Sequence, residues 1–132
     1  MLSPNTLSEF IRNCDNSNIA VLTALAPNPF GYGRIVRDKN NSIVAIIEEK
    51  DATEDQKLIT EINSGIYYVD AKILFSLLDE VKSNNAQNEF YLTDIITHGI
   101  SKQLKVVANT QAPFTEILGV NTKEQLQDIE FF

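Results

Sequence analysis

The stretch I-N-S-G-I-Y-Y-V at residues 62–69, followed by A-K-I-L-F-S-L-L-D-E-V at residues 71–81, decides the fold class of this chain. The first segment is apolar and rich in β-branched and aromatic residues, which predicts a strand. Gly65 inside it predicts the close approach of another backbone or of a ligand. In the second segment, apolar residues recur three and four positions apart, which predicts an amphipathic helix. A strand that passes directly into a helix is typical of α/β layered domains.

Other strands are predicted from runs that are rich in β-branched or apolar residues. The run at 19–25 is continuously apolar, which indicates a buried strand. The runs at 34–37 and 42–47 surround a polar turn and predict a hairpin. The remaining predicted strands are 104–108 and 114–118.

Helices are predicted between these strands. Thr6 is expected to cap the first helix, Thr53 to cap a short second one, and Asn121 or Thr122 to cap the last. Apart from 71–81, the predicted helices are 6–12, 51–59, 90–103 and 123–129. Strands that alternate with helices indicate a single α/β domain over residues 1–132, with a mostly parallel or mixed sheet flanked by helices.

The composition excludes several classes of function. Of 132 residues, 43% are apolar and 22% are charged, which is normal for a globular domain and argues against a disordered chain. The net charge of −7 opposes binding to nucleic acid and to anionic membranes. A single cysteine excludes a disulfide framework and a cysteine-based zinc site. The first residues lack the pattern of a secretory signal, so we expect the protein in the cytoplasm.

The loops at the carboxyl ends of the predicted strands are the first place to look for a ligand site. They are 27–33, 48–51 and 119–122. The chain contains no Walker loop, no G-x-G-x-x-G and no H-E-x-x-H motif. Loops with asparagine, glutamate and glycine suit a hydroxyl-rich ligand, because a sugar needs several fixed donors and acceptors.

Five motifs follow one another along the chain. They are F-G-Y-G-R-I at 30–35, I-E-E-K-D-A-T at 47–53, E-I-N-S-G-I at 61–66, N-N-A-Q-N-E-F-Y-L-T-D at 84–94 and G-V-N at 119–121. In this order and spacing they resemble the bacterial N-acetylglucosamine-1-phosphate uridyltransferases. These are UDP-N-acetylglucosamine pyrophosphorylases that are usually fused to an acetyltransferase. The resemblance extends over residues 6–129 and implies a nucleotide-diphospho-sugar transferase fold, a Rossmann-like mixed sheet flanked by helices.

The resemblance implies substrate-binding roles for four residues, and no catalytic side chain. Gly33 matches a glycine whose backbone N–H contacts the sugar, and Glu48 matches the carboxylate that accepts hydrogen bonds from sugar hydroxyls. Asn63 matches a sugar-binding asparagine. Asn121 matches an asparagine that contacts substrate and shares Mg²⁺ with an aspartate.

Each of these residues also has a structural interpretation. Gly33 suits the geometry of a turn, and Glu48 suits a solvated strand end. Asn63 can serve a structural hydrogen bond, and Asn121 can be an ordinary helix N-cap.

A second group of polar residues lies near the expected position of the sugar phosphate. The resemblance places Glu89, Tyr91 and Thr93 at the start of a helix, and a helix N-terminus favours an anion. Capping of the helix is the alternative role, which we favour for Thr93. Lys50 is expected to be a surface lysine rather than a phosphate ligand.

The chain also departs from the family that it resembles. The glycine-rich basic loop, the phosphate-contacting lysine and the Mg²⁺-binding aspartate of the family are not in this sequence, and neither are the hexapeptide repeats of the acetyltransferase. The resemblance therefore covers only the later, sugar-binding half of the uridyltransferase domain, and we expect the chain alone to be inactive. In the complete enzyme, which makes a peptidoglycan precursor, N-acetylglucosamine 1-phosphate attacks the α-phosphorus of UTP and pyrophosphate leaves with the help of Mg²⁺.

The expected partner is a sugar nucleotide or a sugar phosphate, with no nucleic acid and no membrane. Two alternatives remain open. The chain is a non-catalytic remnant or self-associating module, or it is one half of a split enzyme. Loss of the front half of a sheet leaves a strand edge and an apolar patch uncovered, so a homo-oligomer or a complex with a missing N-terminal half is expected.

Overall fold

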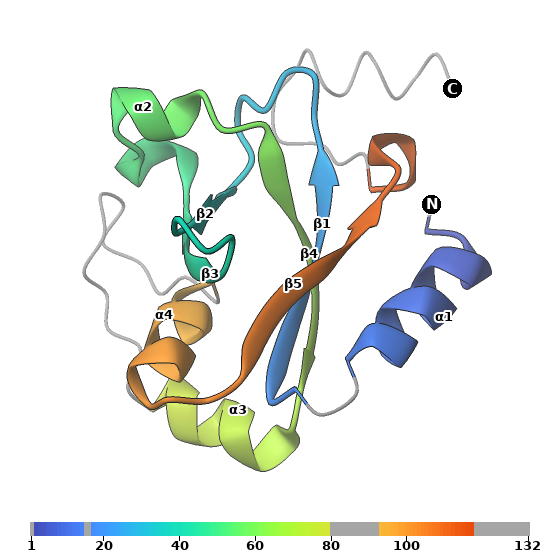
Figure 1. The fold of residues 1–132 in the computed structure, drawn as a ribbon, viewed down its shortest axis with the longest axis vertical. Coiled ribbons are helices and arrows are strands. Elements are labelled where there is room, and N and C mark those ends of the chain that lie inside the picture. The colour runs from blue at the N-terminus through green and yellow to red at the C-terminus, as the bar shows by residue number, and fades with distance from the viewer. Residues whose placement is uncertain (1, 15–16, 80–92, 118–132) are drawn as a thin grey trace.

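The computed structural model describes residues 2–14, 17–79 and 93–117 of the chain (Figure 1). Its helices are α1 (Pro4–Asn13), α2 (Glu54–Lys57), α3 (Ala71–Leu78) and α4 (Asp94–Ser101). Its strands are β1 (Ile19–Leu25), β2 (Arg34–Arg37), β3 (Ile43–Ile47), β4 (Glu61–Val69) and β5 (Val106–Ala112). Short 3₁₀ turns cover Glu49–Asp51 and Phe114–Glu116.

The strands form one mixed sheet in the order β3-β2-β4-β1-β5. Only β5 runs parallel to its neighbour β1 among the described strands, and the other pairs are antiparallel. The expected α/β class with a mixed sheet is confirmed, whereas a mostly parallel sheet is wrong. The predicted hairpin is confirmed as β2 and β3, which pair antiparallel.

The side chains of β1 show why this run forms a central strand. Ile19 and Val21 pack into a core with α3 and α4, whereas Ala20 and Leu22 pack against α1. Successive side chains of a strand point to opposite faces, so a continuous apolar run fills both cores. Figure 1 shows α1 on one side of the sheet and α3 with α4 on the other.

The sheet curls so that its edge strands β3 and β5 approach each other. Ile43 at the start of β3 and Ala108 in β5 belong to the same buried core. Arg37 of β2 spans the remaining gap, because its guanidinium donates a hydrogen bond to the Ala108 carbonyl. The hairpin is therefore fastened to the far edge of the sheet as well as to β4.

Strand β4 contains a bulge centred on Gly65. Between the pairs Val21 with Tyr67 and Thr23 with Asn63, β4 has three residues where β1 has one. Gly65 has φ +84°, and a Cβ added there would meet no atom within 4 Å. The expected close approach of another backbone is therefore wrong, and the glycine is needed for the left-handed backbone of the bulge.

Side chains satisfy two backbone amides of this bulge. The amide of Gly65 donates to Asn63 Oδ1 at 2.8 Å. The amide of Ile66 donates to Ser64 Oγ at 3.1 Å. The chain therefore makes its own hydrogen bonds where the regular ladder between strands is interrupted.

Several predicted element bounds differ from the structure because a nearby side chain decides them. The first helix begins at Pro4, and Ser3 caps it instead of Thr6, accepting from the Thr6 amide at 3.2 Å. Thr53 caps α2 as expected, within a capping box that includes Gln56. The predicted strand 104–108 is instead β5, at Val106–Ala112.

The predicted strand at 114–118 is wrong, because Phe114–Glu116 form a 3₁₀ turn directly after Pro113. The ring of Phe114 lies edge-on against Tyr32, with 5.9 Å between ring centroids. A carboxylate oxygen of Glu116 accepts a hydrogen bond from the Ser3 amide at 2.7 Å. These tertiary contacts favour the turn over an extended strand.

Other predictions reach beyond the described residues. The helix predicted over 90–103 is described only as α4, and that over 71–81 only as α3. The final predicted helix at 123–129 lies outside the described residues. Within the described ranges, no helix has the length and apolar character needed to cross a membrane.

Candidate functional site

Three of the four residues that the motifs single out lie together in the structure. A Cβ added to Gly33 would lie 3.3 Å from Glu48 Oε1. The carbonyl of Gly33 accepts a hydrogen bond from the backbone N–H of Asn63 at 2.9 Å. Asn121, the fourth residue, lies outside the described residues. We call Gly33, Glu48 and Asn63 the polar cluster.

The strand pairing explains why residues 15 and 30 positions apart converge. Arg34 pairs with Ile47 across the hairpin, so Gly33 directly before β2 faces Glu48 directly after β3. Arg34 also pairs with Ile62, which is the one residue pair that joins β2 to β4 among the described residues. This pair sets Asn63 beside Gly33.

The amide group of Asn63 is held at both ends. Its Oδ1 accepts from the Gly65 amide at 2.8 Å, and its Nδ2 donates to the Tyr67 hydroxyl at 2.9 Å. Tyr67 was not singled out from the sequence, because a tyrosine in an apolar run reads as an ordinary strand residue. The glycine two positions after Asn63 was the one available signal of the bulge that brings these groups together.

The carboxylate of Glu48 is half-buried and poorly supplied with donors. Burial raises its pKa, and the nearby carboxylates of Asp51 and Asp94 raise it further. The nearby Thr93 hydroxyl lowers the pKa of Glu48. A carboxylate with a raised pKa still has the capacity to accept hydrogen bonds from a ligand.

Thr93 does not cap α4, although it precedes the helix. Its side chain makes no capping bond, so the favoured capping role is wrong. The residue is 5% exposed, and its Oγ1 meets hydrogen-bond geometry with no described residue. The hydroxyl is therefore buried beside Glu48 with unused hydrogen-bonding capacity.

Carboxylates gather beside the N-terminus of α4. Asp94 is the first residue of α4; burial raises its pKa, the charge of His98 lowers it and the charge of Asp51 raises it. Glu48 lies near Asp94, whose charge raises the pKa of Glu48. A phosphate bound there would meet these negative charges, which oppose the attraction of the helix end. Glu89 and Tyr91, the other residues expected near the sugar phosphate, lie outside the described residues.

A buried arginine holds the loop that leads to Gly33. Arg34 is 2% exposed and donates to Glu49 Oε1 at 2.7 Å. The same oxygen accepts from the Gly31 amide at 3.1 Å, and Gly31 has φ +87°. Arg34 also donates to the carbonyls of Tyr32 and Lys57. The loop is thereby fastened to the 3₁₀ turn and to α2.

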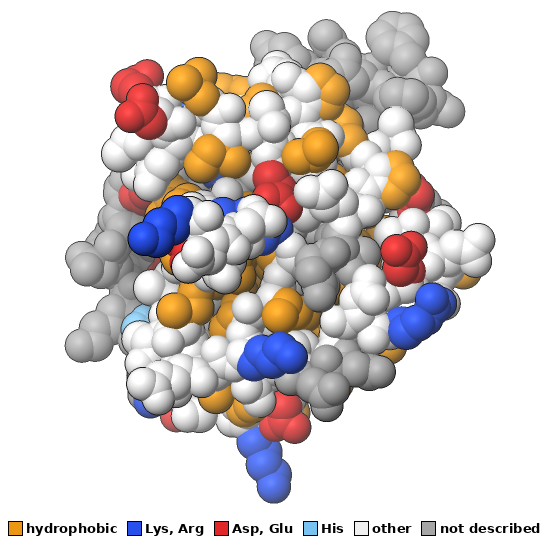
Figure 2. Space-filling model, in the orientation of Figure 1, with side chains coloured by type: hydrophobic (Ala, Val, Ile, Leu, Met, Phe, Trp, Pro, Cys, Tyr) orange, Lys and Arg blue, Asp and Glu red, His pale blue; other side chains and the backbone are white. Residues whose placement is uncertain are grey.

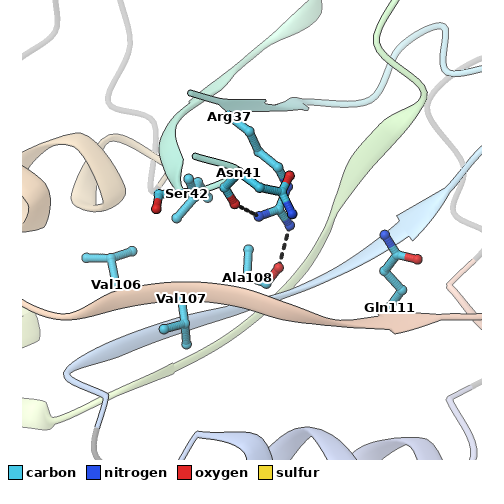
Figure 3. A pocket seen from close by; sticks show the side chains of 8 residues that line it. Arg37, Asn41, Ser42, Val106, Val107, Ala108 and Gln111 are labelled. Atoms are coloured by element: carbon cyan, nitrogen blue, oxygen red, sulfur yellow. Dashed lines mark hydrogen bonds between the residues drawn. The ribbon is translucent and has the colours of Figure 1, made fainter. Parts of the chain in front are cut away.

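A hollow of about 480 Å³ lies away from the polar cluster, between the hairpin and β5 (Figure 3). No residue of the polar cluster lines it. Figure 3 shows Arg37 reaching across it toward Asn41 and Ala108, and both backbone carbonyls accept from its guanidinium. We do not regard this hollow as the site, because its charged group is already bound within the protein.

The described residues do not form a metal site. Within residues 2–14, 17–79 and 93–117, no three His, Cys, Asp or Glu side chains are arranged to hold a metal ion. Asn121, which the resemblance links to Mg²⁺, is not among them. On the face in Figure 2, acidic and basic side chains of the described residues are interspersed without a continuous basic area.

Comparison with known proteins gives a consistent set of relatives. No family model matches the chain. The chain is 48% identical over 115 residues to the bifunctional protein GlmU of Lactococcus lactis, covering 87% of this chain and 25% of the relative. It is 42% identical over 127 residues to GlmU of Nitrosococcus oceani, covering 96% and 28%. The chain thus spans little more than a quarter of these curated relatives.

Two solved structures share the fold. A nucleoside-diphosphate-sugar pyrophosphorylase from Vibrio cholerae matches with a TM-score of 0.65 at 9% identity, over 100% of this chain and 50% of that one. The second is a proposed glucose-1-phosphate thymidylyltransferase from Bacillus anthracis, solved in complex with sucrose. It matches with a TM-score of 0.58 at 23% identity, over 92% and 45%. The fold of this chain therefore corresponds to about half of such a structure.

Proposed function

Because this chain is homologous to part of the bifunctional protein GlmU, as its motifs indicated, we propose that it is the sugar-binding part of a UDP-N-acetylglucosamine pyrophosphorylase. The observation that supports this proposal is the convergence of Gly33, Glu48 and Asn63. We propose that residues 1–132 form one domain and that its polar cluster holds the N-acetylglucosamine unit of a sugar phosphate or sugar nucleotide.

The chemistry of the polar cluster suits a neutral, hydroxyl-rich ligand. Sugar hydroxyls would donate to the Glu48 carboxylate, whose raised pKa reflects its burial and the carboxylates near it. Gly33 leaves space beside this carboxylate that a side chain would fill. Asn63 adds an amide whose orientation is held by the protein. Prearranged groups of this kind reduce the entropy lost on binding.

In the complete enzyme, the task of these residues is to orient the sugar phosphate. Its phosphate oxygen attacks the α-phosphorus of UTP, and pyrophosphate leaves. Homology to GlmU implies Mg²⁺ in the complete protein, where it would neutralise phosphate charge. The described residues do not fit a Mg²⁺ site, and Asn121 is the residue that we propose for it. Residues 1–132 alone are expected to bind the sugar without turning over UTP.

Calorimetry with UDP-N-acetylglucosamine tests this function. We expect saturable binding to the wild-type chain, and clearly weaker binding by Glu48→Gln. Glu54→Gln is the matched control, because the Glu54 side chain is 93% exposed. UDP without a sugar should bind more weakly than the sugar nucleotide. A wild-type chain that binds no sugar nucleotide at millimolar concentration would contradict the proposal and favour a non-catalytic remnant.

A turnover assay tests the expected inactivity. The pure chain, supplied with UTP, Mg²⁺ and N-acetylglucosamine 1-phosphate, should release no pyrophosphate. Release of pyrophosphate by the pure chain would contradict the expectation. Release only after co-expression with an N-terminal half would show that the chain is one half of a split enzyme.

A further inference from the structure

Tyr67 is a half-buried residue of β4 whose ring and hydroxyl have different surroundings. Its ring packs against the core that contains Ile19 and Leu77. Its hydroxyl accepts the Asn63 Nδ2 hydrogen bond at 2.9 Å. Tyr67 thus contacts both the apolar core and the polar cluster.

The bulge makes this contact possible. In a regular strand, residues four positions apart are separated by about 13 Å along the strand. The three residues between Asn63 and Tyr67 instead form the bulge, in which Gly65 has φ +84°. The shortened path and the length of the tyrosine side chain bring the two polar groups within hydrogen-bond distance.

The same bulge determines which way the Asn63 amide faces. The Gly65 N–H can only donate, so the group beside it must be Oδ1 and the opposite group must be Nδ2. Nδ2 carries two hydrogens, of which one is donated to Tyr67. The second hydrogen has no acceptor among the described residues, so it remains available to a ligand.

The Tyr67 hydroxyl stays protonated while it accepts this bond. Burial raises the pKa of Tyr67, the Asn63 hydrogen bond lowers it, and the negative charge of Glu48 raises it again. The influence of Glu48 also shows that the hydroxyl lies near the polar cluster. At neutral pH, Asn63 therefore always meets a neutral phenol oxygen.

We propose that Tyr67 is a positioning residue that acts through Asn63. The tyrosine hydroxyl and the Gly65 amide together fix the Asn63 amide plane, so that the second Nδ2 hydrogen is presented to the sugar. This inference rests on the proposed function. It assigns to the bulge of β4 the role of holding a sugar-binding amide.

A double-mutant cycle measures whether Tyr67 acts through Asn63. Tyr67→Phe removes only the hydroxyl, and we expect it to weaken the binding of UDP-N-acetylglucosamine about three- to tenfold, as for one lost hydrogen bond. Asn63→Ala should weaken binding at least as much, and the double variant no more than Asn63→Ala alone. Tyr68→Phe is the matched control, because Tyr68 is 45% exposed and pairs with Ala20 on the other face of the sheet.

Independent losses that add in the double variant would overturn the proposal, as would unchanged affinity in Tyr67→Phe. NMR of the ligand-free protein separates this failure from failure of the proposed function. The side-chain amide signals of Asn63 should shift in Tyr67→Phe and stay in place in Tyr68→Phe. If these signals do not shift, the positioning role of Tyr67 is wrong, whether or not the protein binds a sugar nucleotide. If they shift but the wild type binds no sugar nucleotide, the proposed function fails while the contact itself is upheld.

Discussion

Glu48 directly follows β3 and Glu61 is the first residue of β4. The structure changes the pKa values of these two glutamates in opposite directions. Burial favours the protonated form of both carboxyl groups. At Glu61, hydrogen bonds from Arg37, Thr23 and Gln111 outweigh burial and lower the pKa. At Glu48, the Thr93 hydroxyl is the one opposing group, and the pKa is raised.

The difference separates a carboxylate that stabilises the fold from one that is available to a ligand. Arg37 donates to both oxygens of Glu61, at 2.7 and 2.9 Å, and Thr23 adds a bond of 2.9 Å. A ligand could gain little there, although Arg37 and Gln111 line the hollow of Figure 3. The unused acceptor capacity is at Glu48. In this molecule, hydrogen-bond supply marks the candidate site better than the volume of a hollow does.

The largest expected effect is on stability, from removal of the Glu61 charge. Glu61→Gln leaves the partly buried Arg37 guanidinium without its counter-ion, and we expect the free energy of unfolding to fall by about 2 kcal/mol. Urea denaturation measures this change. Glu54→Gln removes a glutamate from the exposed pair with Lys57 and should change stability by no more than about 0.5 kcal/mol. Equal losses of stability in Glu61→Gln and Glu54→Gln would contradict the structural role of Glu61.

The second prediction concerns Glu48, where we expect substitution to affect ligand binding strongly and stability little. Glu48→Gln should weaken the binding of UDP-N-acetylglucosamine about tenfold or more, because charged hydrogen bonds to the sugar are lost. Its stability at pH 7 should be unchanged or slightly higher, because an ionised group is no longer held in a half-buried place. Calorimetry and urea denaturation of the same preparation check both parts. A large loss of stability would place Glu48 in the same structural class as Glu61.

A third, smaller effect is expected from Gly33→Ala. The new Cβ would lie 3.2 Å from Ile46 Cγ2 and 3.3 Å from Glu48 Oε1, so the carboxylate must move by a few tenths of an ångström. We expect sugar-nucleotide affinity to fall about threefold, because one hydrogen bond is misaligned. In the Glu48→Gln background, the same substitution should have less effect. Full additivity would show that Gly33 acts independently of Glu48.

The smallest effect is on the pH dependence of stability, and its sign differs between the two glutamates. The lowered pKa of Glu61 contributes stability above its unfolded value near 4.5, and this contribution is lost as the pH falls through the folded pKa. The raised pKa of Glu48 contributes stability below about 4.5, which is lost as the pH rises through its folded pKa. On acidification from pH 7, Glu48→Gln should therefore lose stability more steeply than the wild type.

Glu61→Gln should lose stability less steeply than the wild type over the same range. Urea denaturation at pH 7, 5.5 and 4 compares the three proteins. Parallel curves for both variants would contradict the opposite pKa directions.

The elements that could be predicted from sequence are those whose own pattern decides them. The run Ile19–Leu25 is apolar on both faces and forms β1 as expected. Thr53 and Gln56 make the capping box of α2 within one turn. In contrast, Phe114–Glu116 form a turn because Tyr32 and Ser3, far away in sequence, bind their side chains. Periodicity contains no information about such partners.

The candidate site shows the same limit. The resemblance of the motifs named Gly33, Glu48 and Asn63, and strand pairing brings them together. The role of Tyr67 depends on a bulge, which exists only in the register between β4 and β1. The Glu61 carboxylate accepts hydrogen bonds from Arg37 and Gln111, which lie on two other strands. Gly65 is a local signal of the bulge but not of the contact with Tyr67, and the hydrogen bonds to Glu61 have no local signal.

The two side-chain-satisfied amides of β4 bear on hydrogen exchange. A backbone amide exchanges its proton with water when its hydrogen bond opens, and a bond to a side chain of the same segment can open without separating two strands. At Gly65 and Ile66 the acceptors are the side chains of Asn63 and Ser64. Both amides are therefore expected to exchange through a local opening of the bulge, while the paired amides of β4 on either side stay protected.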